Sequence, residues 1–445
     1  MGQQVSKLQI ALFAGLFAGL IFLVLFLGGY IKLGGKQIFK VNELTFWGVF
    51  DDQEVWDDAI GEFSRKHPGL DVIYKKISTD EYEQEVLKQL ANPKLPGPDV
   101  IYVHNTWLPK FQDNLQPFPE KSIPITQVRS TYPDVVETDF APDGQMYALP
   151  LYLDTLALYY NKDIFNAARI TRPPKTWEEF QNDVKEISRI DANGEIVNSA
   201  AAIGTARNIN RSTDILALLM LQSGAKMVSR EDKAATFSEL VSTPDGYRSP
   251  GVGALSFYTD FANPLSSSYT WNEKLDYSID AFYAGKTAMM FNYSHHIKTI
   301  RDKSSSLNFG VASMPQPKDQ TRVINYPNYW GLAVTQKAGK ATDLALEFAQ
   351  FLTDKAQAQN YAYYTNRPVA RRDLIEWQET DPDLGLFADQ ALTAVSWWQI
   401  DNSAVEKIFA DMIDAVVLDH EFVDRAVEDA QEKISVLMHK AFTGR

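Results

Sequence analysis

The chain has 445 residues, with 43 basic and 57 acidic side chains and a formal net charge of −14. This length suits two or three domains, and the 45% hydrophobic and 12% aromatic residues can supply a large core. The acidic balance argues against sequence-independent binding of nucleic-acid phosphates and favours a neutral or cationic ligand. Because the chain has no cysteine, it has no disulfides, no thiolate metal sites and no lipid-modified cysteine as an anchor.

A run without charges extends from Ile10 to Ile31, after a short tail over residues 1–9. A helix of this length crosses about 30 Å of hydrocarbon, so we expect a transmembrane anchor followed by a linker over 32–42. The alternative is a cleaved signal peptide, but the run exceeds the usual ~7–15-residue apolar core and no A-x-A-like site follows it. Orientation is in tension with the positive-inside rule, since lysines at 32, 36 and 40 follow the run while only Lys7 precedes it.

Strand and helix patterns alternate in the region that follows. Apolar runs at Leu44–Trp47, Asp71–Tyr74 and Asp99–Val103 predict three strands. Apolar residues at helical spacing predict a helix in each gap between them: Trp56, Ala59, Ile60 and Phe63, then Tyr82, Val86, Leu87 and Leu90. This order predicts a parallel sheet covered on both faces.

The same alternation returns after Asp154, which predicts a second α/β lobe. Leu156–Tyr160 has the pattern of a strand, and Thr176–Glu179 has the pattern of a capping box at a helix start. Amphipathic helices are predicted over 344–352 and 423–437. Ligands of open α/β sheets bind at the carboxyl ends of strands, so the loops after Trp47, Val103 and Phe291 are the ones to inspect.

Several segments, in this order, resemble the extracellular solute-binding protein family that includes maltose-binding protein. The resemblance covers nearly everything after Glu43. The segments are LTFWGVFDDQEVWDDAIGEFSRKHPGLDV, PDVIYVHNTWL, GQMYALPLYLDTLALYYNKDIF, PPKTWEEF, FYAGKTAMMFNYSHH, NFGVASMPQPK, NYWGLAVTQKAGKATDLALEFAQFLTD and NRPVARRD.

The resemblance implies a two-lobed, type II periplasmic-binding-protein-like α/β fold with a hinge. Lobe I would comprise residues 43–155 and 335–366, and lobe II residues 156–329 and 367–445. The chain would cross between the lobes near Leu156, near 330–334 and near Asn366.

The implied function is that of the sugar- or oligosaccharide-binding component of an ABC importer. The body would lie outside the cytoplasm, held at the cell membrane by the N-terminal helix, with permease transmembrane subunits as partners and no cofactor. No P-loop, nucleophile-elbow, zincin or dinucleotide-binding motif is present in the sequence. Two alternatives stay open: a cleft glycosidase with two carboxylates, and a ligand-sensing module for a membrane receptor.

Sugars stack their apolar C–H faces on aromatic rings, and their hydroxyls pair with carboxylates, amides and arginine. At positions matching the family's ligand loops, lobe I offers Asp51, Trp107 with its neighbours His104 and Asn105, and Asp154. Each has a structural alternative. Trp107 could pack under its loop, Asp51 could cap the next helix, and Asp154 could be a turn or cap carboxylate.

In the second lobe, Arg211 matches a sugar-contacting loop of the family, although a surface arginine is the alternative. Tyr293 and His295 stand where the family often presents a tryptophan. The pair His295–His296 does not indicate a metal site, because adjacent histidines do not converge and no third ligand is evident. The remaining candidates are Tyr329 and Trp330 in the second crossing, and Trp397 and Trp398, of which one is expected to face the cleft and the other the core.

Overall fold

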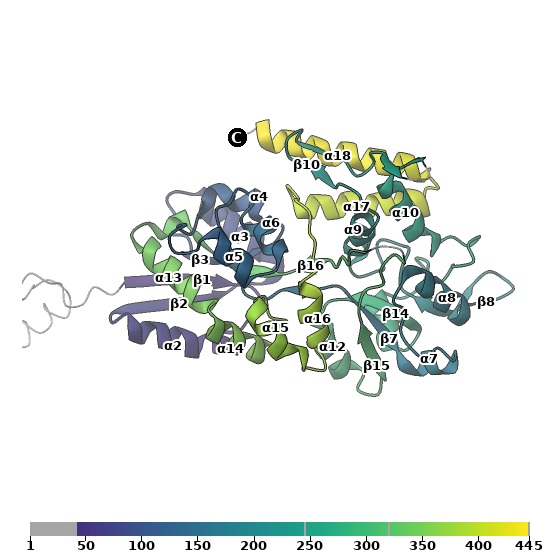
Figure 1. Ribbon diagram of the computed structural model, residues 1–445, viewed down its shortest axis with the longest axis horizontal. Coiled ribbons are helices and arrows are strands. Elements are labelled where there is room, and N and C mark those ends of the chain that lie inside the picture. Colours follow the sequence, from purple (N-terminus) through teal and green to yellow (C-terminus); the bar gives the residue numbers. More distant parts are fainter. Residues whose placement is uncertain (1–41, 244–245, 319–320, 444–445) are drawn as a thin grey trace, which may run out of the picture.

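The computed structural model describes residues 42–243, 246–318 and 321–443, which form two α/β lobes side by side (Figure 1). Each lobe has its own hydrophobic core. Within these residues no helix is long and apolar enough to cross a membrane. The expected anchor over 10–31 and most of the linker after it lie outside the described residues.

Lobe I is built on a sheet with the order β2–β1–β3–β17–β4, in which β5 also pairs with β17. The predicted strands form as β1 (Asn42–Gly48), β2 (Leu70–Lys76) and β3 (Val100–His104), and these three are parallel. β3 is buried on both faces, which explains its uninterrupted apolar sequence. The other strands are β17 (Trp330–Thr335), β4 (Leu115–Gln116) and β5 (Ala148–Pro150).

The helices of lobe I cover this sheet, and the two predicted from apolar spacing form as α2 (Asp57–Lys66) and α3 (Thr79–Ala91). The others are η1 (Gln53–Val55), α4 (Leu108–Phe111), η2 (Gln112–Asn114), α5 (Ile125–Thr131), α6 (Asp134–Phe140), η3 (Gln336–Ala341), α13 (Thr342–Leu352), α14 (Lys355–Thr365), α15 (Arg372–Glu379) and α16 (Gly385–Ala391).

Lobe II has a sheet with the order β15–β7–β14–β9–β8. Its strands are β15 (Phe309–Ala312), β7 (Ala157–Asn161), β14 (Thr287–Asn292), β9 (Ile196–Ala201) and β8 (Arg189–Ile190). Two short hairpins lie outside the sheet: β10–β11 (Val228–Ser229, Ala234–Ala235) and β12–β13 (Val241–Thr243, Gly246–Arg248).

The helices of lobe II include α8, whose start follows the predicted cap: the Thr176 hydroxyl accepts from the Glu179 N–H at 3.2 Å. The Glu179 carboxylate accepts from the Lys175 N–H at 2.7 Å. The helices are α7 (Lys162–Ala167), α8 (Trp177–Ile187), α9 (Ser212–Gln222), α10 (Pro250–Asp260), α11 (Ser278–Tyr283), α12 (His296–Lys303), α17 (Asn402–Val417) and α18 (Val423–Thr443).

Two crossings between the lobes run side by side as a short antiparallel pair, β6 (Asp154–Thr155) with β16 (Pro327–Asn328). The first crossing lies where it was expected, next to Leu156. The second precedes the expected range, because residues 330–335 already form β17 in the sheet of lobe I. Antiparallel pairing of two short strands gives the lobes a narrow connection that can bend.

The third crossing was expected near Asn366, but the chain stays with lobe I beyond that residue. Asn366 ends α14 in the left-handed conformation (φ 53°), which turns the chain back. Arg372 of α15 then donates to the Tyr132 carbonyl at 2.7 Å and to Asp134 at 2.7 Å, both in lobe I. α16 already touches lobe II, since Phe387 lies in the core of that lobe and Arg301 of α12 pairs with Asp383. The chain passes into lobe II over 392–401, between α16 and α17 (Figure 1).

Candidate functional site

A small cavity lies between the lobes beside the hinge. Lobe I contributes His104 and Thr106, the hinge contributes Asn328, and lobe II contributes Asp214 and Glu406 among others. The cavity measures about 30 Å³, which is roughly the room for one or two water molecules. A sugar can therefore reach these side chains only when the lobes move apart.

Arg211 lies at the start of α9 in the left-handed conformation, with φ 65°. A residue with a Cβ atom is strained there by about 1 kcal/mol or more. Its guanidinium carbon lies 5.3 Å from the centre of the Tyr293 ring, and its buried Nε atom has no hydrogen-bond partner in the part of the chain that the structure describes. A buried donor without a partner is costly, so this atom is suited to binding an acceptor from a ligand.

Asp214 and Tyr293 are joined, because the Tyr293 hydroxyl donates to the Asp214 carboxylate at 2.8 Å. Burial raises the pKa of Asp214 and the charge of Arg211 lowers it in part. Tyr293 follows β14 directly and Asp214 is in the first turn of α9, so the carboxyl end of a strand and the N-terminus of a helix meet at the cavity.

Glu406 reaches the cavity from α17, together with Asn402 at the start of that helix. Partial burial in the cleft, and then the negative charge of Asp214, raise the pKa of Glu406 to about 7. The side chain still has surface in contact with water. The Asn402 side-chain oxygen is buried, and the described residues offer it no hydrogen-bond partner. Asp214, Asn402 and Glu406 were not predicted from the sequence as ligand contacts, because polar residues near the start of a helix are ordinarily solvated.

His104 connects lobe I to the hinge. Its Nδ1 atom lies 2.7 Å from the Thr106 hydroxyl and its Nε2 atom 3.4 Å from the Asn328 side-chain oxygen. Burial lowers the pKa of His104 to about 3, so the ring is neutral. The acceptor on Asn328 assigns the ring proton to Nε2, which leaves Nδ1 to accept from Thr106.

Asn105 and Tyr329 form hydrogen bonds with Asp139, a buried carboxylate of lobe I. Asn105 donates to it at 3.1 Å and the Tyr329 hydroxyl at 2.8 Å. The Ser396 hydroxyl, from the third crossing, donates to the other oxygen. Burial raises the pKa of Asp139 to about 7. This network holds the third crossing on lobe I and does not line the cavity.

Trp107 packs in the core of lobe I. Its ring is stacked on Phe111 at 5.4 Å and on Tyr82 at 6.2 Å, and the ring of Trp330 meets it at 4.8 Å. Trp330 in turn contacts the ring of His104 at 5.2 Å. Since the Trp107 ring is buried among these three aromatic rings, it could stack on a sugar only by leaving the core, and the packing favours the structural alternative.

Asp51 is buried and forms neither an N-cap nor part of the cavity lining. It accepts from the hydroxyls of Tyr102 at 2.6 Å and Tyr361 at 2.8 Å, and from Arg367 at 3.3 Å. The Arg367 guanidinium carbon lies 4.5 Å from the centre of the Tyr152 ring. These contacts tie the first loop of lobe I to the segment just after α14.

Asp154 lies on hinge strand β6 with its carboxylate buried. It accepts from the Ser294 N–H at 3.0 Å, from the Ser294 hydroxyl at 2.7 Å and from the Thr155 N–H at 2.8 Å. Burial raises the pKa of Asp154 to about 7. The carboxylate thus holds the loop after β14, and its oxygens already have donors within the protein.

His295 is exposed, and its ring lies 6.4 Å from that of Tyr293 and 4.3 Å from that of His296. Trp397 lines the cavity and also stacks on Phe409 at 5.8 Å, so one residue meets both the cleft and the core. Trp398 is half-buried beside Arg230, whose guanidinium carbon lies 5.9 Å from the centre of its ring.

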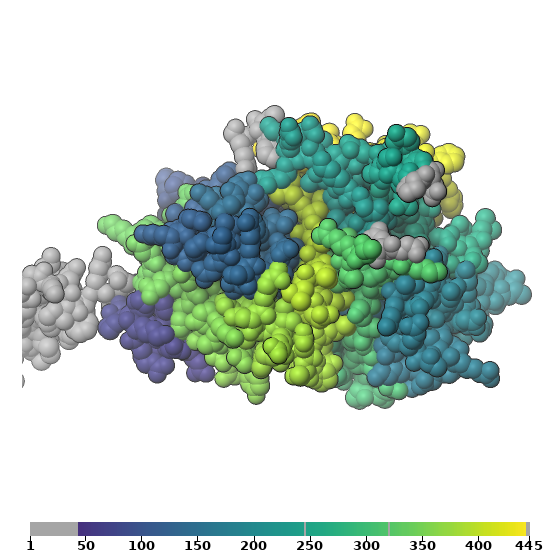
Figure 2. All heavy atoms as spheres, viewed as in Figure 1, coloured from purple at the N-terminus to yellow at the C-terminus, as the bar shows by residue number. Residues whose placement is uncertain are grey.

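Two ion pairs join the lobes outside the lining of the cavity. Lys110 of lobe I lies 3.2 Å from Asp401 and also pairs with Glu83. Arg230 of lobe II lies 3.3 Å from Asp143 of lobe I. In Figure 2 the blue atoms of lobe I approach the teal atoms of lobe II, with yellow-green atoms visible between them.

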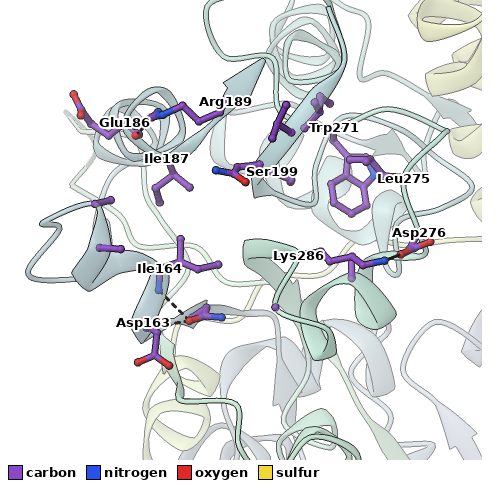
Figure 3. A pocket seen from close by; sticks show the side chains of 18 of the residues that line it. Asp163, Ile164, Glu186, Ile187, Arg189, Ser199, Trp271, Leu275, Asp276 and Lys286 are labelled. Atoms are coloured by element: carbon purple, nitrogen blue, oxygen red, sulfur yellow. Dashed lines mark hydrogen bonds and ion pairs between the residues drawn. The ribbon is translucent and has the colours of Figure 1, made fainter. Parts of the chain in front are cut away.

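A larger hollow of about 980 Å³ lies at the other end of lobe II, between α7, the β8–β9 hairpin and the turn before β14 (Figure 3). Asn161 at its edge caps α7, and Lys286 pairs with Asp276 at 2.6 Å. β14 runs from this hollow at Thr287 toward the hinge, where Tyr293 follows it. The hollow is therefore separate from the cleft, and its size alone does not make it the ligand site.

The comparison with known proteins identifies the class. Residues 47–359 match the profile of the bacterial extracellular solute-binding protein family. The chain belongs to this family, which confirms the resemblance drawn from its sequence. Because the proteins of this family are extracellular, the two-lobed body lies outside the cytoplasm.

Individual relatives are distant. A binding protein of Brucella abortus is 22% identical over 257 residues, and the match spans 57% of each chain, so little more than half of that relative is covered. The galactooligosaccharide-binding protein of Bacillus subtilis is 20% identical over 76% of this chain and 75% of its own. The mannitol-binding protein of Pseudomonas aeruginosa is 23% identical over 67% and 70%, respectively.

Solved structures share the fold. The sugar-binding protein MalE of Xanthomonas citri has a TM-score of 0.72 at 20% identity, covering 90% of this chain and 98% of its own. The cyclic alpha-maltosyl-1,6-maltose binding protein of Arthrobacter globiformis has a TM-score of 0.73 at 18% identity, covering 90% and 99%. Both likenesses establish the two-lobed architecture.

Proposed function

We propose that this protein binds a sugar or a related polyhydroxylated solute between its lobes and delivers it to the transmembrane subunits of an ABC importer. The observation that carries the proposal is the polar cavity at the hinge, lined by side chains from both lobes. The names of the B. subtilis and P. aeruginosa relatives, for a galactooligosaccharide and for mannitol, agree with this class of solute.

The cavity offers both kinds of partner that hydroxyl groups need. Among the lining residues Asp214, Glu406 and Asn402 supply acceptors. Arg211 does not line the closed cavity, but it lies over the ring of the lining residue Tyr293, and its Nε atom would supply a donor once the lobes open. We propose these four as ligand contacts together with His104, Tyr293 and Trp397. Asp51, Asn105, Trp107, Asp154, Tyr329 and Trp330 would support the site by holding its loops, while His295 and Trp398 would lie at its edge.

Binding would stabilise the closed arrangement of the lobes, because the solute touches both walls only when they approach each other. The paired strands β6 and β16 would bend, and the third crossing over 392–401 would move with them. A permease would then recognise the closed body.

We propose further that residues 10–31 anchor the body to the membrane. The motivation is their length without charge and the lack of cysteine to carry a lipid. Full-length protein should remain with membranes through a high-salt wash, and protease added to intact cells should cleave the body. Recovery of a shortened soluble protein would identify a signal peptide instead, and a protected body would reverse the orientation.

A thermal-shift screen over mono-, di- and oligosaccharides and polyols tests the solute class. A ligand present at 100 times its Kd stabilises the folded state by about 2.7 kcal/mol. The Arg211→Met variant should lose this shift, while Lys286→Met, in the separate hollow of lobe II, should keep it. A screen in which no sugar or polyol shifts the parent would refute the proposal. Cleavage of an oligosaccharide during incubation would favour the glycosidase alternative.

A further inference from the structure

The lobe II wall of the cavity is acidic. Asp214 comes from α9 and Glu406 from α17, two helices that pack on one another. Among the described residues that line the cavity there is no lysine and no arginine. Because both carboxylates belong to the same lobe, opening and closing of the cleft leaves their arrangement intact.

The charged groups on this wall are both acceptors, and they stand beside neutral donors such as the Trp397 Nε1 atom. Ionised carboxylates accept and cannot donate. Asp214 receives the Tyr293 hydroxyl at 2.8 Å, which leaves lone pairs for a ligand. The side-chain oxygen of Asn402 is a further acceptor, buried and unpartnered within the described part of the chain. A ligand group that meets the two carboxylates or the Asn402 oxygen must therefore bring hydrogen-bond donors.

The nearby cations do not cancel the two carboxylates. Arg211 lies over the Tyr293 ring, and its positive charge partly opposes the rise in the pKa of Asp214 and of Glu406, but it is a single cation beside two carboxylates. Lys110, on the lobe I side, is engaged by Glu83 and Asp401. His104 is neutral because burial lowers its pKa. The cleft therefore holds more negative than positive charge.

We infer that the cleft selects a polyhydroxylated solute that carries no anionic group where it meets lobe II, and that it prefers an amino sugar to the matching acidic sugar. The inference rests on the proposed function. Hydroxyls of a neutral sugar satisfy the acceptors, and an ammonium group adds attraction to both carboxylates. A uronate or phosphate placed there would face like charge, which suppresses binding.

Matched triads of monosaccharides test this inference: glucose, glucosamine and glucuronate, then galactose, galactosamine and galacturonate. At pH 8 and low salt the amino sugar of each triad should bind most tightly and the acidic sugar least tightly, with the neutral sugar between them. The affinities of the amino and the acidic sugar should differ by about tenfold or more. An acidic sugar that binds more tightly than its neutral parent would overturn the inference and leave the proposed function intact. If no member of either triad binds, the same comparison is made with amino, neutral and acidic forms of the oligosaccharide that the thermal-shift screen identifies. Absence of binding by every sugar and polyol in that screen would count against the proposed function itself, and the inference would fail with it.

Variants that each remove one charge then show whether Asp214 and Glu406 cause the preference for amino sugars over acidic sugars. Asp214→Asn and Glu406→Gln should each reduce the ratio of amino-sugar to acidic-sugar affinity several-fold. Glu432→Gln, an exposed carboxylate on α18, makes the same change in net charge and should leave the ratio as in the parent. Circular dichroism verifies folding of each variant, and two separate carboxylate variants keep the test valid if one fails to fold. A ratio unchanged in both cleft variants would contradict the inference.

Discussion

Asp154 on the hinge accepts two hydrogen bonds from Ser294, one from the backbone N–H at 3.0 Å and one from the hydroxyl at 2.7 Å. Ser294 follows Tyr293, whose hydroxyl bonds to Asp214. The carboxylate that the family resemblance assigned to the ligand thus connects the hinge to the loop that carries Tyr293. We expect it to act on the ligand by positioning that loop.

Asp154→Ala should weaken binding by about 1–3 kcal/mol, because the donors of Ser294 lose their acceptor and the loop loosens. Ser294→Ala should weaken it less, since the backbone bond remains. In the Asp154→Ala background, Ser294→Ala should have no further effect. Calorimetric titration of all four proteins with the solute that the screen identifies measures this coupling. If Asp154→Ala loses affinity and Ser294→Ala binds as the parent does, the carboxylate touches the ligand directly.

The contribution of Asp139 and Asp154 to stability should fall as pH rises from about 4 to 7. Burial raises the pKa of Asp139 and of Asp154 to about 7 in the folded protein, whereas an aspartate in the unfolded chain titrates near 3.9. Over this window the unfolded state loses protons that the folded state keeps, so rising pH favours unfolding.

The stability of Asp139→Asn relative to the parent should therefore increase as pH rises through this window, because its side chain does not titrate. Calorimetric melting of the ligand-free proteins between pH 4.5 and 7.5 is the measurement. Identical profiles for the parent and the variant would mean that Asp139 titrates alike in both states.

Trp107→Ala should destabilise lobe I by about 3–5 kcal/mol, because the ring is stacked on two aromatic neighbours in the core. Trp107→Phe keeps part of this packing and should cost less. Urea unfolding followed by circular dichroism gives both values. A Trp107→Ala protein with parental stability and lost sugar binding would return this residue to the list of ligand contacts.

Lys110→Met should favour the open arrangement, because it removes an ion pair that joins the lobes through Asp401. Exposed pairs contribute about 0–1 kcal/mol, and this lysine is more enclosed than most. Small-angle scattering of ligand-free protein should therefore give a larger radius of gyration at low salt. Scattering identical to that of the parent would show that the pair does not hold the lobes together.

Local sequence patterns predicted several helices and strands of the two lobes. The apolar spacing of α2 and α3, the strands β1, β2 and β3 and the Thr176 cap all depend on residues close together in the chain. The third crossing escaped prediction, because the contacts of Arg372 with Tyr132 and Asp134 join distant segments. The role of Asp51 was hidden for the same reason, since Arg367 lies 316 positions away.

The cleft itself was only partly predictable. Arg211 and Tyr293 could be found because they match positions of a known family. Asp214 and Glu406 could not, since each is a polar residue near a helix start that would be solvated in an isolated helix. Only the packing of α9 against α17 at the hinge brings the two carboxylates to one cavity.

The most direct test of the interlobe site is calorimetric titration of the identified solute into the parent, into Arg211→Met and into Lys286→Met. If the solute binds in the cleft, Arg211→Met should lose about tenfold or more in affinity, as expected when a charged hydrogen-bond donor is removed, and Lys286→Met should bind as the parent does. A folded Arg211→Met protein with parental affinity, together with a weakened Lys286→Met, would move the site to the far hollow of lobe II and contradict the account.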